Sequence, residues 1–310
     1  MERGYLSHDA PIPAVRILAG RRRLYLSDRQ THRILETTHA GRVLRYFGCG
    51  RPGLMDGDSA SAAFRQPGGL AADDERLYVA DMDNHAIRCI HLVSGVVSTL
   101  AGYGAAAGTR EFYSQMPQAM GLHTPLDVAR DGETIYIVMA GWRQIWALTK
   151  TAIGRCAGCG RAECIDADLL EAAFVAPVTV AVHECCLYVA DSGAAALRLV
   201  DLNLRRVTTL ARAASDKEYW RPVDLALDMP SGRLYFTSTE DAVVRWLELK
   251  SGRIHALPDM LAPSLASSLH LAGDTLWAAS RGGHLLCRNM RTGHCAAIQL
   301  HDEQSLGEQA

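Results

Sequence analysis

The stretch FRQPGGLAADDERLYVADMDNHAIRCIHLVSGVVSTLAG, from Phe64 to Gly102, decides the fold of this chain. It reads as a proline, an apolar strand, a polar turn, the strand LYVAD, a loop, and two further apolar strands joined by a turn. Short apolar runs bounded by Gly, Asp and Ser are typical of buried β-strands. We therefore predict four consecutive strands within this one segment.

The LYVAD segment has five counterparts along the chain. They are LYLSD from Leu24, IYIVM from Ile135, LYVAD from Leu187, LYFTS from Leu234 and LWAAS from Leu276. The repeats are expected to start near Pro13, Pro67, Pro125, Pro177, Pro222 and Ala266. A period of about 40 to 50 residues indicates a repeat architecture.

A lone four-stranded sheet cannot bury both of its faces, whereas six sheets arranged radially can. We predict an all-β fold, a six-bladed β-propeller of four-stranded antiparallel blades that spans residues 1–310 as a single domain. The segment AAIQL, residues 296–300, should supply the fourth strand of the last blade.

Composition narrows the classes of partner. The formal net charge is −2, so no overall basic field exists to attract phosphates, and we do not expect nucleic acid as a partner. The N-terminal sequence has no apolar stretch of signal-peptide length and no window resembles a membrane span, which predicts a cytoplasmic location without a membrane. Nine cysteines at irregular spacing favour reduced thiols.

The second copy resembles the NHL repeat. The similarity lies in MDGDSASAAFRQPGGLA, in VADMDNHAIR with Asn84 and His85, and in VVSTLAG. The segment DGETIYIVMAGWRQIWAL, residues 131–148, is similar to the matching blade of NHL proteins fused to a thioredoxin-like domain. The resemblance implies an NHL propeller, with Asn84 and His85 holding the signature turn, and it suggests a thioredoxin-like partner. NHL propellers include protein-binding and RNA-binding modules and relatives of lyases and hydrolases, so the fold alone assigns no reaction.

The candidate site is the channel mouth, on the face where the loops leading into the innermost strands lie. The repeat register places there Arg16, Gly69, Asp127, Thr179, Asp224 and Ser268. The leading loops add Arg65, His123, Trp220 and Arg221, and the loop after the second strand of the third blade adds Trp142 and Arg143. Guanidinium groups, carboxylates, an imidazole and two indole walls suit a small anionic or amphipathic ligand.

A structural alternative accompanies three of the candidates. Asp127 and Asp224 could instead cap exposed backbone N–H groups of the next loop, and His123 could be a solvated or satisfied loop histidine.

Two functions remain open. The first is a non-catalytic scaffold that binds a protein, a peptide or a small molecule at the mouth. The second is an enzyme of the lyase or hydrolase class, with acid–base residues His123, Asp127 and Asp224, similar in placement to the amidating lyase, gluconolactonase and strictosidine synthase propellers. The cofactor stays unassigned: a metal at the mouth is compatible with these side chains, and a nucleotide is not expected because no phosphate-binding motif is present.

A cysteine-rich stretch offers a weaker metal signal. Cys156, Cys159 and Cys164 have a C-x2-C-x4-C spacing that could supply three thiolates to zinc, while free thiols or a redox-sensitive pair are the alternative. Cys185 and Cys186 fall in a turn that the repeat places on the opposite face. We predict that the two groups do not share a metal.

Overall fold

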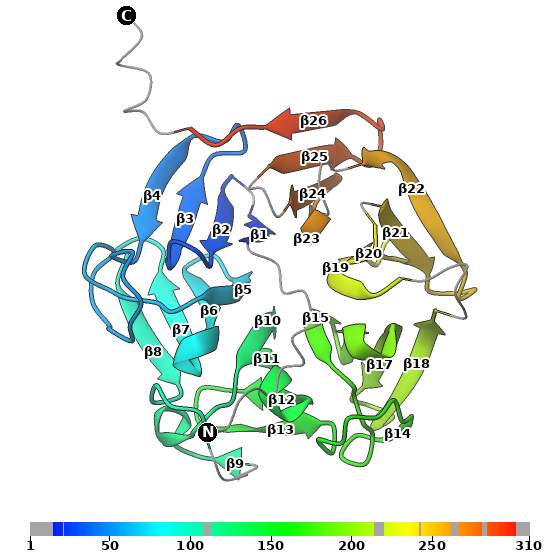
Figure 1. The fold of residues 1–310 in the computed structure, drawn as a ribbon, viewed down its shortest axis with the longest axis horizontal. Coiled ribbons are helices and arrows are strands. Elements are labelled where there is room, and N and C mark those ends of the chain that lie inside the picture. The colour runs from blue at the N-terminus through cyan, green and yellow to red at the C-terminus, as the bar shows by residue number, and fades with distance from the viewer. Residues whose placement is uncertain are drawn as a thin grey trace, which may run out of the picture.

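The structure is a computed structural model that describes residues 15–20, 22–107, 113–213, 220–241, 243–261, 266–280 and 284–301. Over these residues six antiparallel sheets stand around a central axis (Figure 1). The predicted all-β, six-bladed propeller is confirmed.

The first three blades have their strands in sequence order from the axis outward. Blade 1 consists of β1 (Val15–Ala19), β2 (Leu24–Asp28), β3 (Arg33–Thr37) and β4 (Val43–Phe47). Blade 2 consists of β5 (Pro67–Ala72), β6 (Arg76–Asp81), β7 (Ala86–His91) and β8 (Val97–Ala101). Blade 3 consists of β10 (Pro125–Asp131), β11 (Thr134–Met139), β12 (Gln144–Leu148) and β13 (Ile153–Ala157), with β9 (Tyr113–Ser114) at its outer edge.

The other three blades repeat this order. Blade 4 consists of β15 (Pro177–His183), β16 (Cys186–Asp191), β17 (Ala196–Asp201) and β18 (Arg206–Arg212), with β14 (Ala167–Asp168) at its outer edge. Blade 5 consists of β19 (Pro222–Asp228), β20 (Arg233–Ser238), β21 (Val243–Glu248) and β22 (Ile254–Leu261). Blade 6 consists of β23 (Ala266–Ala272), β24 (Thr275–Ser280), β25 (Leu285–Asn289) and β26 (Cys295–Ile298).

Helical structure in the described residues is limited to short 3-10 turns: η1 (Met82–Asn84), η2 (Pro117–Ala119), η3 (Ala140–Trp142) and η4 (Ser192–Ala194). None of these turns has the length or apolar character needed to cross a bilayer.

The blade boundaries follow the prolines. Four first strands begin at the predicted prolines and β23 begins at Ala266, whereas Pro13 lies outside the described residues and β1 is described from Val15. A first strand borders the channel and pairs on one side only, so a proline there removes no ladder hydrogen bond.

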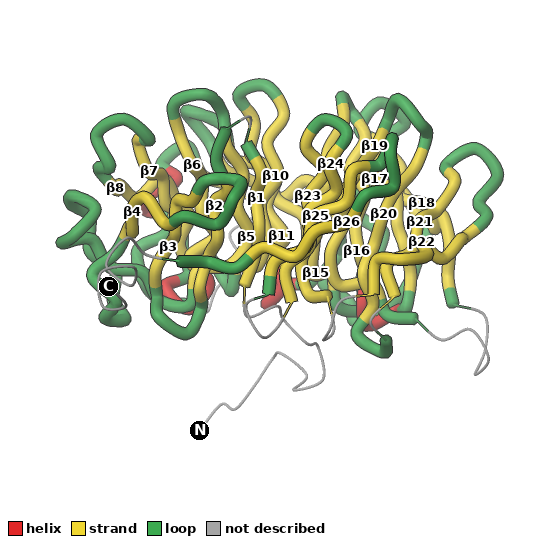
Figure 2. The backbone as a smooth tube through the Cα atoms, turned by 90° about the horizontal axis from the view of Figure 1, so that it is seen from above, coloured by secondary structure: helices red, strands yellow, loops and turns green. Residues whose placement is uncertain are grey.

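The alternation of strands gives the ring two unlike faces. The leading-loop face carries the loops before each first strand and the loops between second and third strands. The turn face carries the turns between first and second strands and between third and fourth strands. Figure 2 shows the ring edge-on, with 3-10 turns along its lower, leading-loop edge.

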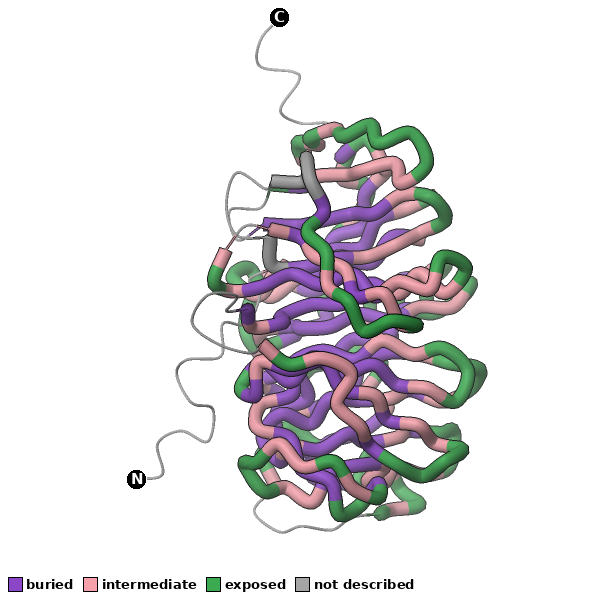
Figure 3. The backbone as a smooth tube through the Cα atoms, turned by 90° about the vertical axis from the view of Figure 1, so that its right-hand side faces the viewer, coloured by how far each residue is buried: buried purple, intermediate pink, exposed green. Residues whose placement is uncertain are grey.

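The hydrophobic core lies between neighbouring blades. Buried strand centres run between exposed turns (Figure 3), and Trp146, Phe64 and Phe236 are fully buried between sheets. Each such side chain contributes about 2 kcal/mol through burial, so the blade stack supplies most of the stabilisation.

The ring is also joined at its rim. Blade 6 builds its own fourth strand, as expected, and the chain then continues to blade 1, where Val43 N donates to His301 O at 2.9 Å and His301 N donates to Gly41 O at 3.0 Å. Gly41 has φ +90°, and a Cβ there would lie 2.1 Å from Gln299 O. Only glycine fits this junction without rearrangement.

Candidate functional site

The predicted mouth residues Arg16, Asp127 and Asp224 do come together, but as a buried layer inside the channel, 3%, 6% and 5% exposed. Arg16 reaches across the axis from blade 1. Its Nη1 lies 2.5 Å from Asp224 Oδ1 of blade 5, and its Nη2 donates to Val178 O of blade 4 at 3.1 Å. The guanidinium therefore occupies the channel at this level.

The side chains of this channel layer also link consecutive blades. In three blades the side chain accepts a hydrogen bond from the first strand of the next blade: Val180 N to Asp127 Oδ2 at 3.0 Å, Leu269 N to Asp224 Oδ2 at 2.8 Å, and Ile17 N to Ser268 Oγ at 3.0 Å. Thr179 Oγ1 donates to Asp224 Oδ1 at 3.1 Å. Side-chain oxygens thus accept from backbone N–H groups, as in the structural alternative, but the donors lie in the buried first strands of the next blades and not in exposed loops.

Charge in this layer is unbalanced, because two carboxylates share one guanidinium. Burial raises the pKa of Asp127 from 3.8 to about 6; Arg16 opposes the rise and Asp224 adds to it. The Asp127 carboxylate occupies the space over Gly69, where a Cβ would lie 1.7 Å from Oδ1. Blade 2 therefore has glycine at the position equivalent to Asp127, because a larger side chain would collide with that carboxylate.

His123 belongs to a different cluster, on the leading-loop face. Its ring lies over Gly141, where a Cβ would be 1.8 Å from Nδ1, and its centroid is 5.8 Å from that of His85. His85 Nδ1 accepts a hydrogen bond from Thr124 N at 2.9 Å, which requires an unprotonated Nδ1. Burial lowers the pKa of both imidazoles, and for His85 the neighbouring His123 adds to the effect. The lowered pKa thus favours the neutral His85 imidazole, which the hydrogen bond from Thr124 N requires.

Equivalent residues join other blades, and we call each such contact, from a side chain on the loop after a second strand to the backbone of the next leading loop, an interblade clasp. His32 Nδ1 accepts from Gln66 N at 3.1 Å, and Arg143 Nε donates to Val175 O at 3.1 Å. His32, His85 and Arg143 have φ of 56°, 49° and 55°, the left-handed conformation that turns each side chain toward the next blade. The histidine of the signature therefore joins blades.

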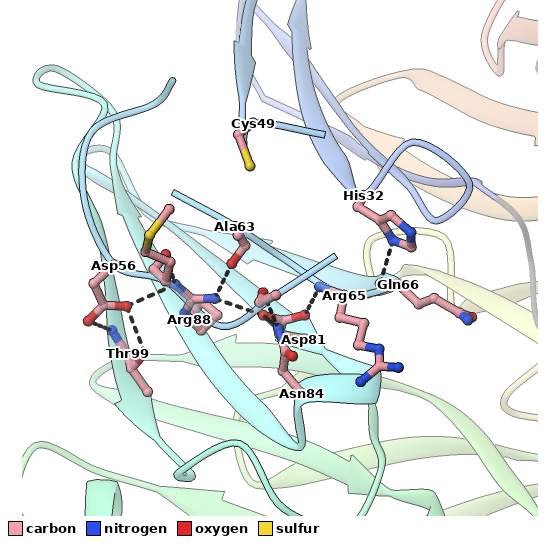
Figure 4. Close-up of polar contacts among 12 residues, drawn as sticks. His32, Cys49, Asp56, Ala63, Arg65, Gln66, Asp81, Asn84, Arg88 and Thr99 are labelled. Carbon is pink, nitrogen blue, oxygen red and sulfur yellow. Dashed lines mark hydrogen bonds and ion pairs between the residues drawn. The ribbon is translucent and has the colours of Figure 1, made fainter. Parts of the chain in front are cut away.

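A second network, centred on the fully buried pair Arg88 and Asp81, was missed by sequence reasoning, and we call it the arginine lock. Arg88 donates from Nη1 to Asp81 Oδ2 and from Nη2 to Asp56 Oδ1, both at 2.8 Å (Figure 4). Asn84 Nδ2 donates to the same Asp81 oxygen at 2.8 Å, so Asn84 has the expected structural role.

Blade 4 contains a copy of this lock. Arg198 contacts Asp166 at 2.8 Å and Asp191 at 3.5 Å. Both arginines stand 32 residues after the loop aspartate. This spacing, between MDGDSASAAF and IDADLLEAAF and their later arginines, is the signal that could have revealed the lock.

Comparison with known sequences agrees with this geometry. Residues 64–90, which contain most of the Arg88 lock and the clasp histidine His85, match the family profile of the NHL repeat. The chain is a six-bladed β-propeller that contains an NHL repeat.

Relatives of this NHL propeller share part of its length. It is 32% identical over 206 residues to NHL repeat-containing protein 2 of Gallus gallus and 33% identical over 206 residues to that of Homo sapiens. It is 42% identical over 105 residues to the chloroplastic protein SUPPRESSOR OF QUENCHING 1 of Arabidopsis thaliana.

Coverage is unequal in these pairs. The matches to the two NHL repeat-containing proteins cover 58% of this chain and 28% of each relative, and the plant match covers 31% of this chain and 10% of the relative. Among solved structures, the one titled "Crystal structure of Nidogen/Laminin Complex" superposes with a TM-score of 0.64 at 15% identity, covering 90% of this chain and 93% of that chain. It shows the fold alone.

Two tryptophans that were predicted to wall the ligand site lie in the core of this NHL propeller instead. Trp142 and Trp220 are 7% and 4% exposed and pack on Trp146 and Phe236, with ring centroids 5.0 and 5.1 Å apart. Burying an indole between blades is more favourable than leaving it in water. Both therefore belong to the core and offer little surface to a ligand.

The predicted arginines of the leading-loop face have separate surroundings. Arg65 is exposed; its backbone N donates to Asp81 Oδ1 at 2.8 Å while its guanidinium extends away from the lock (Figure 4). Arg221 N donates to Ser238 Oγ at 3.1 Å, and its Nε lies 3.8 Å from Glu240 Oε1.

The cysteines follow the predicted division between faces. Cys185 and Cys186 lie at the turn from β15 to β16, on the turn face, whereas Cys159 and Cys164 lie in the loop after β13, on the leading-loop face. Within the described ranges, no three His, Cys, Asp or Glu side chains are placed to hold one metal ion.

Proposed function

We propose that this NHL propeller is a scaffold that binds acidic segments of partner proteins on its leading-loop face, over blades 1 to 3. The carrying observation is a continuous set of side chains from three blades, which we call the arginine–histidine surface: Arg29, Arg65, Gln66, Asp83, His85 and His123.

Contacts connect these side chains from blade to blade. Arg29 Nη2 donates to Gln66 Oε1 at 2.6 Å, which joins blade 1 to the loop leading into blade 2. His85 lies on the next loop. It is close enough to Arg65 for the guanidinium to lower the pKa of the His85 imidazole further. His123 continues the surface onto blade 3, with its ring 5.8 Å from that of His85.

The charge of the surface favours an acidic partner. The two arginines of this surface outnumber its single carboxylate, that of Asp83, which acts on both Arg29 and His85. A guanidinium can hold a carboxylate through two parallel hydrogen bonds, and the exposed Arg65 is placed to do so.

The backbone of this surface is already fixed. The clasps from His32 to Gln66 and from His85 to Thr124 hold both leading loops in one conformation. A partner that binds there orders few groups, so more of the contact free energy appears as affinity.

The enzyme alternative gains less support. Asp127 and Asp224 accept backbone hydrogen bonds inside the channel, whereas His123 packs over Gly141 on the outer surface. His123 is thus separated from the two carboxylates, which lie together in the channel layer, and this separation favours binding over acid–base catalysis. We place the binding in the cytoplasm, and a thioredoxin-like protein is one candidate partner because of the family resemblance.

A peptide-array screen tests the proposal, followed by affinity measurements on the retained peptides. We expect these peptides to be rich in Asp and Glu, and Arg65→Glu to weaken binding at least about tenfold, or 1.4 kcal/mol. The charge-matched control is Arg206→Glu, at an exposed residue on the turn face. Binding that survives Arg65→Glu and is lost in Arg206→Glu would place the interaction on the other face.

A further inference from the structure

We propose that a groove between the outer halves of blades 2 and 3 binds a small carboxylic acid with a linear aliphatic tail. The groove has a volume of about 520 Å³. Its lining runs from Arg76 and His91 on blade 2 to Glu133 and Lys150 on blade 3, which places it on the turn face. This site is separate from the arginine–histidine surface and does not rest on the proposed scaffold function.

Small side chains open this groove. Residues paired across the second, third and fourth strands of a blade point to the same face of the sheet. The equivalent sets are Tyr25, Glu36 and Arg45 in blade 1, Tyr78, Cys89 and Ser98 in blade 2, and Tyr235, Trp246 and His255 in blade 5. The second and third members are large in blades 1 and 5 but small in blade 2, where all three members line the groove.

The large side chains fill the corresponding spaces beside blades 1 and 5. Arg45 Nη2 donates to Glu36 Oε2 at 2.6 Å and to Leu92 O of blade 2 at 2.7 Å, so this pair bridges blades 1 and 2. In blade 5 the rings of Trp246 and His255 stack with centroids 4.2 Å apart. Cys89 and Ser98 are too small to fill the equivalent space, which leaves room for a ligand.

An arginine stands two residues before the tyrosine in the same three blades. Arg23 Nε lies 3.4 Å from Glu36 Oε1, and the Arg233 guanidinium lies 4.3 Å from the centroid of the Trp246 ring. Arg76 is exposed, and the ion pairs of the described residues do not include it. A ligand carboxylate in the groove would therefore bind Arg76 as Glu36 binds Arg23 in blade 1.

The accessible apolar surface of the groove suits an aliphatic tail. It is supplied by Val96, which is 47% exposed, and by the half-buried Leu100 and Pro117. From Val96 to Leu100 the strand rises about 13 Å at roughly 3.3 Å per residue. Ile135 and Leu148 are buried and close the groove beneath this surface. A linear tail of medium length can thus extend from Arg76 along blade 2.

The charge of the lining favours a monoanion. Arg76 and Lys150 outnumber Glu133, whose Oε2 lies 2.8 Å from Lys150 Nζ. His91 lines the same end, with its Nδ1 3.1 Å from Ser94 Oγ. Burial raises the pKa of the Cys89 thiol to about 11, so no thiolate opposes the ligand at neutral pH.

Other carboxylates stand near the opening. Asp73 is held by Arg130 Nη2 at 3.3 Å and by the Tyr78 hydroxyl at 2.9 Å. The exposed carboxylates of the adjoining turns, which do not line the groove, are Asp74, Glu75 and Asp131. The surroundings are therefore of mixed charge, and selectivity for a carboxylate comes from contact with Arg76 and not from a long-range field.

Isothermal titration with three probes tests the site: octanoate, 1-octanol, which lacks the carboxylate, and octylamine, which carries the opposite charge. Octanoate should bind saturably and at least about fivefold more tightly than either analogue. Arg76→Gln should remove this preference. Arg206→Gln, the same change at an exposed turn-face residue of blade 4, should leave it intact.

A second variant tests the shape of the groove without changing its charge. Ser98 is exposed and lines the groove, so Ser98→Trp should abolish octanoate binding. Ser251→Trp, at an exposed turn residue of blade 5, should not. Equal affinity of the unaltered protein for the three probes, or no saturable binding of octanoate, would overturn the proposal. So would octanoate binding that both Arg76→Gln and Ser98→Trp leave unchanged.

Discussion

Replacing Asp224 and Asp127 one at a time distinguishes the roles of these two channel carboxylates, which occupy equivalent positions in the sequence repeat. Asp224 is the ion-pair partner of Arg16, with Nη1 and Oδ1 2.5 Å apart and both side chains buried. Asp127 is the extra carboxylate, whose pKa is about 6 because burial outweighs the attraction of Arg16. Asparagine keeps one acceptor oxygen at either position. Both oxygens of Asp224 accept hydrogen bonds, so Asp224→Asn also loses the contacts of one of them.

The magnitudes follow from the pairing. Removing one partner of a buried ion pair costs about 3 to 5 kcal/mol, because the other charge is left uncompensated. In Asp224→Asn the ionised Asp127 can still face Arg16 and offset part of this, which leaves a loss of about 1 to 3 kcal/mol. In Asp127→Asn the Arg16 pair stays intact, so the free energy of unfolding at pH 8 should equal or exceed that of the unaltered protein.

The pH dependence has a definite sign. The folded pKa of Asp127, about 6, is higher than its ordinary value of 3.8, so the folded state holds this proton more tightly. Its contribution to stability is therefore present at low pH and is lost as pH rises from about 4 to about 6. The advantage of Asp127→Asn over the unaltered protein should grow across that window, by up to about 3 kcal/mol, and then level off.

Urea unfolding of the two variants and the unaltered protein, from about pH 4.5 to pH 8, measures these differences. Asp224→Asn should be the less stable variant at every pH above about 6. A loss of stability at pH 8 that is equal in both variants, or a difference for Asp127→Asn that does not change with pH, would refute the assignment of the ion pair to Asp224.

Three further predictions concern the framework. Gly41→Ala should destabilise the propeller by about 2 to 4 kcal/mol in thermal unfolding, because the new Cβ would lie 2.1 Å from a backbone oxygen. Gly20→Ala is the control, because its Cβ would lie 3.5 Å from the nearest atom. Equal effects of the two substitutions would contradict the rim closure. Arg198→Met should cost about 3 kcal/mol or more and expose the loop at residues 158–176 to proteolysis, and an unchanged cleavage rate would contradict the lock. Acidification below the lowered pKa of His85 should speed hydrogen exchange at the Thr124 amide, since a protonated Nδ1 cannot accept its bond; exchange independent of that titration would contradict the clasp.

Much of the fold could be predicted because its signal is local and repeated. Each LYVAD-like strand and its preceding proline specify one blade, so Pro67 with Leu77 and Pro177 with Leu187 mark equivalent positions. The register also predicted that Asp127 and Asp224 approach one another.

What the pattern could not predict was the direction of those side chains. The pairing of β10 with β11 shifts register between Pro125 and Asp127, and the same irregularity occurs in β15 between Pro177 and Thr179. A bulge re-aims the residue beside it, here toward the next blade. The Trp142 indole likewise turns inward because of the 3-10 turn η3, which leaves no periodic trace in the sequence.

The most direct test of the proposed interaction face is photocrosslinking in cell extract, with p-benzoylphenylalanine placed at Asp83 in one protein and at Arg206 in a second. Asp83 is partly exposed beside Arg29 and His85 on the leading-loop face, and Arg206 is exposed on the turn face. A leading-loop binding surface predicts a discrete crosslinked partner from Asp83→p-benzoylphenylalanine, competed by an acidic peptide from the array, and none from the Arg206 protein. A discrete, competed partner from Arg206 alone would contradict it.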